Sequence, residues 1–177
     1  MLEALITSKT RINLLLKFFL NSNNKGWLRS LESEFGESTN AIRLELNRLL
    51  KAGLLTATNE GNRKVYKANT DHPLYNDIHN LLFKHIGLDK IIERITTKLG
   101  ELESVYLVGE LAKGKNSKMI DLWFVGTDLD KNYLLNLIEK SENKINKKIR
   151  YIILTQNELK DFIKGKSTDE LLLVWEA

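Results

Sequence analysis

The sequence contains no cysteine, and this absence excludes several kinds of chemistry. Without thiols the chain forms no disulfide, offers no thiolate ligand to a metal ion and has no cysteine nucleophile. Such a composition fits a reducing compartment. The sequence also lacks any apolar run of about eighteen residues, and its first six residues are too short for a signal peptide. We therefore expect a cytoplasmic protein that has no membrane association.

The length and the charge distribution suggest two parts with different roles. The 177 residues suffice for one large domain or two small ones, and an apolar content of 42% is enough to form real cores. Residues 1–72 hold eleven Lys or Arg and seven Asp or Glu, whereas residues 73–177 hold sixteen of each. The whole net charge of +4 therefore lies in the first part. A positive field there favours the approach of a polyanion.

The segment Gly36–Lys67 predicts a helix followed directly by a β-hairpin. Ser38 is a suitable N-cap for a helix that begins at the next residue, and Gly53 is a suitable residue to end it. The apolar face of this helix consists of Ile42, Leu46, Leu49 and Leu50. The strands of the hairpin are expected at residues 54–58 and 63–67, with a turn between them.

Polar residues on the opposite face of this helix and on the hairpin indicate DNA recognition. Arg and Asn side chains pair in bidentate fashion with guanine and adenine edges, and Lys and Arg on the return strand contact phosphate. The candidate DNA-binding residues are Thr39, Asn40, Arg43, Asn47, Arg63, Lys64 and Lys67. The alternative is a solvated helix face beside an ordinary hairpin. Leu44 falls near the same face, where it either touches a thymine methyl group or packs on a neighbouring element.

Two further helices are expected before this segment, at residues 8–21 and 27–35. Two helices, a tight turn, a recognition helix and a hairpin form the order of a winged helix-turn-helix. The helix at residues 8–21 has a broad apolar surface. We expect the core of its own domain to cover one part of this surface and a second subunit to cover the other.

Residues 8–86 resemble the winged helix-turn-helix of the arsenic-repressor superfamily of bacterial transcription regulators. The matching pieces are Leu46-x-x-Leu49-x-x-Ala52-Gly53-Leu54-Leu55, the wing at residues 59–66, and residues 68–75 entering a helix Leu74–Ile86. The resemblance implies a homodimer in which this last helix pairs with the first helix of a second subunit.

Many members of this superfamily sense metals. The pair Asp77-x-His79 resembles half of a zinc site, but Lys90 stands where the second half would begin. We expect His79 and His85 on a solvated helix face, with no metal ligand and no cofactor.

Beyond Gly87 helices alternate with strands, which predicts a small unit with a mixed sheet. Helices are expected at residues 89–99, at 132–145 and from 156, and strands at 104–108, 119–125, 149–154 and 171–175. The fold class is accordingly α+β or α/β. We expect a winged helix-turn-helix DNA-binding domain over residues 1–87 and an α/β domain over residues 88–177.

The stretches Val105–Gly114 and Ile120–Gly126 resemble the minimal nucleotidyltransferase domain. The resemblance implies a Gly-Ser pair after the first strand, an Asp-x-Asp pair on the second and a third carboxylate on a later strand. These groups hold two metal ions and a triphosphate. Here Glu110 replaces the serine, putting a negative charge where a phosphate should rest, Met119 replaces the first aspartate, and the strand at 148–154 has no acid.

Only one of the expected carboxylates therefore remains, and we expect the domain to have lost catalysis. The predicted vestigial nucleotide site consists of Gly109, Glu110, Lys113 and Asp121. The lysines of the following loop, Lys113, Lys115 and Lys118, either bind an anion weakly or are simply solvated.

Three functions follow from these patterns. The leading interpretation is a dimeric, sequence-specific DNA-binding transcriptional regulator that is not an enzyme and whose second domain senses, scaffolds or binds a partner. The alternative is a nucleotidyltransferase that acts on a protein or a small molecule, with the winged helix as a tether. A protein-interaction module is the third.

Overall fold

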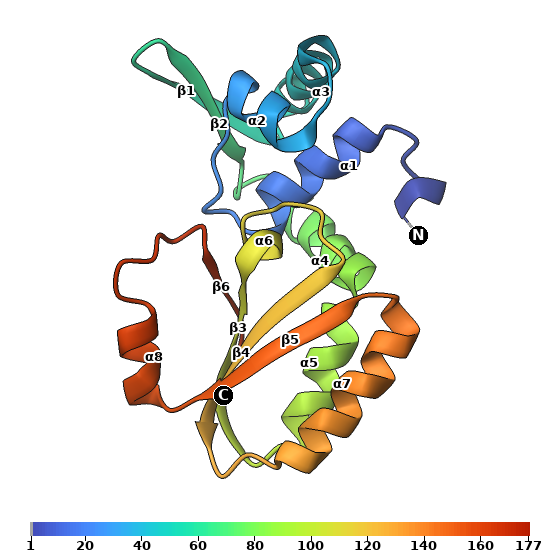
Figure 1. The fold of residues 1–177 in the computed structure, drawn as a ribbon. Helices are drawn as coiled ribbons and strands as arrows, with labels where there is room; N and C mark the ends of the chain where they lie inside the picture. The colour runs from blue at the N-terminus through green and yellow to red at the C-terminus, as the bar shows by residue number, and fades with distance from the viewer. Residues whose placement is uncertain (1) are drawn as a thin grey trace. The chain divides into compact units, whose positions relative to one another are not determined.

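The computed structural model describes residues 2–177, apart from the side chains of residues 97 and 98. The chain divides into two compact units, Met1–His85 and Ile86–Ala177 (Figure 1). Each unit has its own helices and strands and buries its own set of apolar side chains. The division falls at the end of helix α4 (Tyr75–Ile86).

The first unit is built from helices and one β-hairpin. Its elements are the 3-10 helix η1 (Leu2–Ala4), α1 (Lys9–Leu15), the π-helical turn η2 (Leu16–Leu20) that continues it, α2 (Leu28–Phe35), α3 (Thr39–Lys51), β1 (Leu55–Glu60), β2 (Arg63–Ala68) and α4. The helices and the hairpin expected from the sequence are all present. The helix α4 begins at Tyr75, one residue later than expected.

Local hydrogen bonds set the start of α3 and fix the hairpin. The Ser38 side chain accepts a hydrogen bond of 3.2 Å from a backbone N–H in the first turn of α3, as an N-cap does. A two-residue turn, Gly61 and Asn62, joins the paired ends of β1 and β2. Gly26 and Tyr66 exchange two backbone hydrogen bonds, of 3.1 and 2.8 Å, so the segment before α2 lies against the hairpin.

The apolar side chains of α1 and η2 are buried within the single chain. None of them is more than 7% exposed: Ile12, Leu14, Leu15, Leu16, Phe18, Phe19 and Leu20. Removal of this surface from water is the main favourable term in folding. The chain itself covers these side chains, and the second subunit expected beside this helix stays a prediction.

Helix α3 also carries a buried acid, Glu45, which is only 5% exposed. Its carboxylate accepts hydrogen bonds from Arg11 at 2.9 and 3.1 Å, from Arg48 at 3.1 Å and from Ser8 at 3.2 Å. Burial by itself raises the pKa of Glu45, but Arg11, Ser8 and Arg48 together outweigh burial through their hydrogen bonds and charges and leave the pKa below its ordinary value. The cluster ties the start of α1 to α3.

The second unit contains helices around a four-stranded sheet. Its elements are α5 (Leu88–Lys98), β3 (Glu101–Val108), α6 (Gly109–Ala112), β4 (Met119–Thr127), α7 (Lys131–Ile145), β5 (Lys148–Leu154), α8 (Gln156–Phe162) and β6 (Leu171–Glu176). Two of these differ from expectation. Strand β3 begins at Glu101 instead of Ser104, and the expected turn segment begins with the helical turn α6. Among the described residues of both units, no helix is long and apolar enough to span a lipid bilayer.

The sheet has the strand order β5-β4-β3-β6 and is mixed, as predicted. Strand β3 pairs antiparallel with both β4 and β6, whereas β4 and β5 are parallel and are connected through α7. The chain is thus an α+β protein with a mixed sheet.

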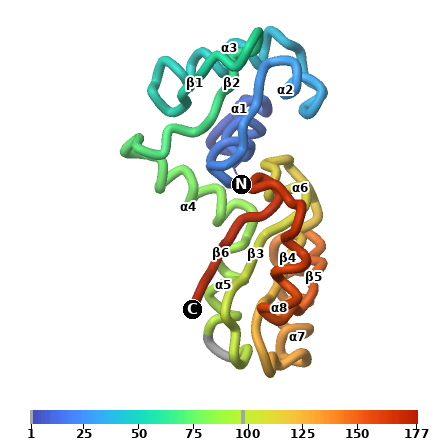
Figure 2. Tube along the Cα trace, turned by 90° about the vertical axis from the view of Figure 1, so that its left-hand side faces the viewer, coloured from blue at the N-terminus to red at the C-terminus, as the bar shows by residue number. Residues whose placement is uncertain are grey.

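The two faces of the sheet are covered differently. Alternate residues of a strand point to opposite faces. One face carries five fully buried side chains, Val105, Leu107, Ile120, Leu122 and Phe124. Helices α5 and α7 lie side by side over this face, and the short helix α8 lies on the other (Figures 1 and 2). The α8 face is packed by Leu159 of α8 against Val108, Trp123, Val125 and Leu154.

Candidate functional site

A cleft of about 500 Å³ lies on the α8 face of the second unit. Its walls come from the end of β3, from β4 and β5, and from the loop after α8. The lining residues are Val108, Gly109, Asp121, Leu122, Trp123, Arg150, Tyr151, Ile152 and Lys166. Sequence reasoning identified Gly109 and Asp121 among them and missed Arg150 and Lys166.

Gly109 brings the end of β3 close to the Asp121 side chain. Its φ of +72° lies in the left-handed region, and a Cβ atom there would lie 2.6 Å from Oδ2 of Asp121. The strand register places Val108 opposite Asp121. A residue without a side chain is therefore needed where the chain turns from β3 into α6 beside the carboxylate.

Replacement of Gly109 by alanine is expected to lower the free energy of unfolding by about 2 kcal/mol. The left-handed conformation costs an L-residue about 1–2 kcal/mol, and the new methyl group must also displace the Asp121 carboxylate. Urea denaturation measures this loss. Gly36→Ala is the matched control, because Gly36 has a φ of +63° and a Cβ there would meet nothing within 4 Å. Equal losses in the two variants would show that the Asp121 contact is unimportant.

Asp121 and Arg150 form a bidentate ion pair across two parallel strands. The register of β4 and β5 makes them direct partners. Arg150 Nε lies 2.6 Å from Asp121 Oδ1, and Nη2 lies 3.0 Å from Oδ2. The hydrogen bond and charge of Asp121 raise the pKa of Arg150, so the guanidinium is a permanent cation. The Arg150 side chain is 69% exposed and the Asp121 side chain 17%.

The remaining wall of the cleft combines a second cation with aromatic and aliphatic surface. Lys166 Nζ lies 5.5 Å from the centre of the Trp123 ring, and Phe162 meets the same ring edge-on at 5.5 Å between centroids. Ile152 remains 36% exposed. The cleft therefore offers one carboxylate, two cations and an apolar surface, a combination suited to an anionic ligand that has an apolar or aromatic part.

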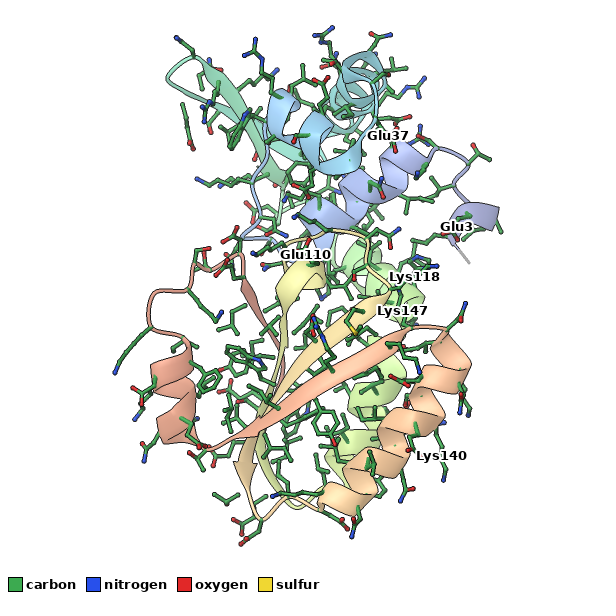
Figure 3. The ribbon with its side chains drawn as sticks, in the orientation of Figure 1. Glu3, Glu37, Glu110, Lys118, Lys140 and Lys147 are labelled. Carbon is green, nitrogen blue, oxygen red and sulfur yellow. The ribbon has the colours of Figure 1, made fainter. Side chains whose placement is uncertain are left out.

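The other predicted residues of this site lie outside the cleft lining. Glu110 lies on α6 (Figure 3), and its carboxylate forms an ion pair of 2.9 Å with Lys115, so its charge is compensated locally. Lys113 forms an ion pair of 2.9 Å with Glu170, and this hydrogen bond raises the pKa of Lys113 and lowers that of Glu170. Lys118 lines a different cavity, on the α7–β5 side.

The donor set of the cleft does not fit two magnesium ions. Asp121 is the one carboxylate among the described lining residues, and both of its oxygens already accept hydrogen bonds from Arg150. Met119 supplies a thioether where Mg²⁺ prefers hard oxygen ligands. In residues 2–177, with the side chains of 97 and 98 aside, His, Asp and Glu form no group of three suited to a metal ion. The chemistry of this cleft must therefore be derived from its own cations.

In the first unit, four of the predicted DNA-binding residues line one cleft of about 650 Å³. These are Arg43 and Asn47 of α3 and Arg63 and Lys64 of β2. The Arg63 guanidinium lies 4.6 Å from the centre of the Trp27 ring, which adds a cation–π contact to the cleft. Thr39, Asn40 and Lys67 are not among the lining residues.

Two other side chains singled out in the sequence also have definite positions. Leu44 is 51% exposed on α3. His79 was expected on a solvated face, but its Nδ1 lies 2.8 Å from the Phe19 carbonyl oxygen and its ring stacks on Tyr75. The histidine therefore connects α4 to η2.

Comparisons with known proteins returned structures and no sequence relatives. No known protein family matches the sequence, and no curated protein does. A solved structure from Sulfolobus solfataricus that is assigned as a nucleotidyltransferase is similar over 55% of this chain and 82% of its own, with 24% identity and a TM-score of 0.37. The toxin–antitoxin MntA-HpeT, in a mutant form, is similar over 50% of this chain and 72% of its own, with 16% identity and a TM-score of 0.37. A toxin–antitoxin with AMP-PNP is similar over 51% and 74%, with 18% identity and a TM-score of 0.38.

These comparisons contradict two predictions made from the sequence. The similar structures are of the nucleotidyltransferase and toxin–antitoxin kind, and none of the three is described as a DNA-binding regulator. The leading interpretation, a transcriptional regulator that is not an enzyme, is therefore corrected, and its alternative, a nucleotidyltransferase, is taken up below as a proposal. The roles of individual residues rest on the cleft itself.

Proposed function

We propose that this chain is a nucleotidyltransferase that acts on a protein or a small molecule. The observation that carries the proposal is the position of Asp121. Its carboxylate lies between the Gly109 turn and Arg150, in a cleft that also contains Lys166. One cavity of suitable size thus contains two cations that can bind an anionic nucleotide, Arg150 and Lys166, and a carboxylate that can act as a base, Asp121.

The residues of this cleft are suited to nucleotidyl transfer to a hydroxyl group. An acceptor hydroxyl oxygen forms a bond to the α-phosphorus of the nucleotide, the bond from that phosphorus to the β-phosphate oxygen breaks, and pyrophosphate leaves. Asp121 takes the proton of the hydroxyl on a carboxylate lone pair that the two Arg150 hydrogen bonds leave open. Arg150 and Lys166 stabilise the charge that develops on the phosphate oxygens, as Arg and Lys do at other sites of phosphoryl transfer. Glu110, whose charge Lys115 compensates, does not oppose this binding.

Pyrophosphate release from ATP tests the proposal. The full chain is incubated with ATP, both in buffer with Mg²⁺ and in buffer with EDTA, and water, the chain itself and a cell lysate are offered as acceptors. We expect release above background, and we expect Asp121→Asn to reduce its rate about a hundredfold, the usual contribution of a positioned base. The control is Asp128→Asn, an exposed residue in the loop after β4 whose positive φ of 49° asparagine tolerates. No release with any acceptor, or equal rates in the two variants, would contradict the proposal.

We also propose that the first unit is a winged helix-turn-helix of the arsenic-repressor type that serves as a tether. Its helices α2 and α3 followed by the β1–β2 hairpin support this assignment. The cleft with Arg43, Asn47, Arg63 and Lys64 is then the surface that holds the tethering partner, with double-stranded DNA as a candidate polyanion. A homodimer through α1 and α4, and a cytoplasmic location, belong to the same proposal.

A further inference from the structure

Arg150 occupies the position on β5 that faces Asp121 of β4. A site that binds triphosphate through two metal ions needs carboxylates gathered at such a position, because each ion requires several hard oxygen ligands. The chain instead places a guanidinium there, 2.6 and 3.0 Å from the Asp121 oxygens. Arg150 therefore supplies the positive charge that a metal ion would otherwise bring to this carboxylate.

The Arg150 side chain retains hydrogen-bonding capacity for a ligand. A guanidinium has five N–H donors in a planar fork, and the pair with Asp121 uses two of them. The side chain is 69% exposed and lines the cleft, so its other donors are accessible from solvent. Arginine held in this way is suited to bidentate binding of phosphate oxygens.

The charge balance of the cleft also favours a phosphate without a bridging ion. Carboxylate sites repel phosphate and need a cation to join the two. Among the described lining residues, the charged groups are Asp121, Arg150 and Lys166, so the cleft carries a net positive charge. Binding of Mg²⁺ to the nucleotide would reduce its negative charge and weaken its attraction to these cations.

We propose that this cleft binds the phosphate groups of a nucleoside triphosphate directly through Arg150 and Lys166, without a divalent cation as a bridge. The inference rests on the proposed function, since it takes a nucleotide as the ligand. It differs from that function in a measurable way, because it concerns how the nucleotide is bound and not whether transfer follows.

Isothermal titration of the full chain with ATP, once with EDTA and once with MgCl₂, tests the inference. We expect ATP to bind with EDTA at least as tightly as with Mg²⁺. Arg150→Met should weaken binding with EDTA at least tenfold, since it removes the fork and the charge together. Lys140→Met is the matched control, because Lys140 lies on α7, away from the cleft lining (Figure 3), and should leave binding unchanged. Thermal unfolding followed by circular dichroism checks that each variant folds.

A charge-reversed variant gives the converse result. Arg150→Asp puts a second carboxylate beside Asp121 and should abolish binding with EDTA, with Mg²⁺ restoring part of it. Binding of ATP by the wild type only with Mg²⁺, or equal binding by wild type and Arg150→Met, would overturn the inference, even if pyrophosphate is released. ATP binding with EDTA but no pyrophosphate release in either buffer would support the inference and overturn the proposed function. No ATP binding in either buffer would overturn both.

Discussion

Replacement of Lys17 by methionine is expected to destabilise the protein by about 3–5 kcal/mol, because it leaves a buried carboxylate without its counter-charge. Lys17 of η2 and Glu34 of α2 form an ion pair of 3.0 Å, and their side chains are only 10% and 13% exposed. The other carboxylate oxygen of Glu34, Oε1, is buried without a hydrogen-bond partner. Glu34 therefore depends on Lys17. The loss is measured by urea denaturation at neutral pH.

Two further variants separate the buried charge from other effects of the Lys17 substitution. The double variant Lys17→Met/Glu34→Leu should recover most of the stability, since apolar residues of similar size often replace a buried pair without loss. Lys25→Met breaks an exposed pair with Glu60, whose side chains are 58% and 54% exposed, and should cost less than about 1 kcal/mol. A loss in Lys17→Met no larger than in Lys25→Met would show that the buried pair has no special importance.

Replacement of Gly100 by alanine is expected to cost about 3–5 kcal/mol. Gly100 joins α5 to β3 with a φ of +103°, and a Cβ atom there would lie 2.4 Å from the backbone oxygen of Asp128. The left-handed conformation and the forced shift of the backbone each contribute about 1–3 kcal/mol. Neither strand nor loop can relax easily, because the Asp130 N–H donates a 2.9 Å hydrogen bond to the Leu99 carbonyl at the same place. Urea denaturation again provides the measurement.

Gly165 provides the control for the Gly100 variant. It has a φ of +78° in the loop after α8, and a Cβ there would meet nothing within 4 Å. Gly165→Ala therefore carries the conformational cost alone, about 1 kcal/mol. The difference between the two variants isolates the clash with Asp128. A difference near zero would mean that the α5–β3 turn moves away from the loop at no cost.

The parts of the fold that depend on local sequence were predictable. Ser38 caps α3 as expected, and α7 covers Lys131–Ile145 against an expected 132–145. The strand expected at 171–175 is present as β6, Leu171–Glu176. Caps, apolar periodicity and turn residues act within a few positions along the chain, so a single sequence displays them directly.

The features that depend on which strands and helices meet were not predictable. The sequence showed that the strand containing Arg150 has no acidic residue. It did not show the pairing of Arg150 with Asp121, which follows from the parallel register of β4 and β5. Lys166 reaches the cleft from a loop that has no motif. The buried carboxylate of Glu45 accepts a hydrogen bond from Arg11, which is far away in the sequence. Counting carboxylates in the sequence shows which metal ligands are missing. It does not show that the cation of Arg150 stands in the place of one of them.

The position of β3 in the sheet has a consequence for the order in which the strands pair. Val108 pairs with Asp121 on one side, which is close in sequence, and with Leu171 on the other, which is distant. Bringing Val108 and Leu171 together closes a long loop, which costs chain entropy before the strand pairing stabilises the sheet. Topologies with such distant contacts fold slowly. The hairpin of the first unit closes over two residues. We therefore expect the β1–β2 hairpin to form early and β6 to add late to the edge of β3, which completes the sheet that holds the cleft.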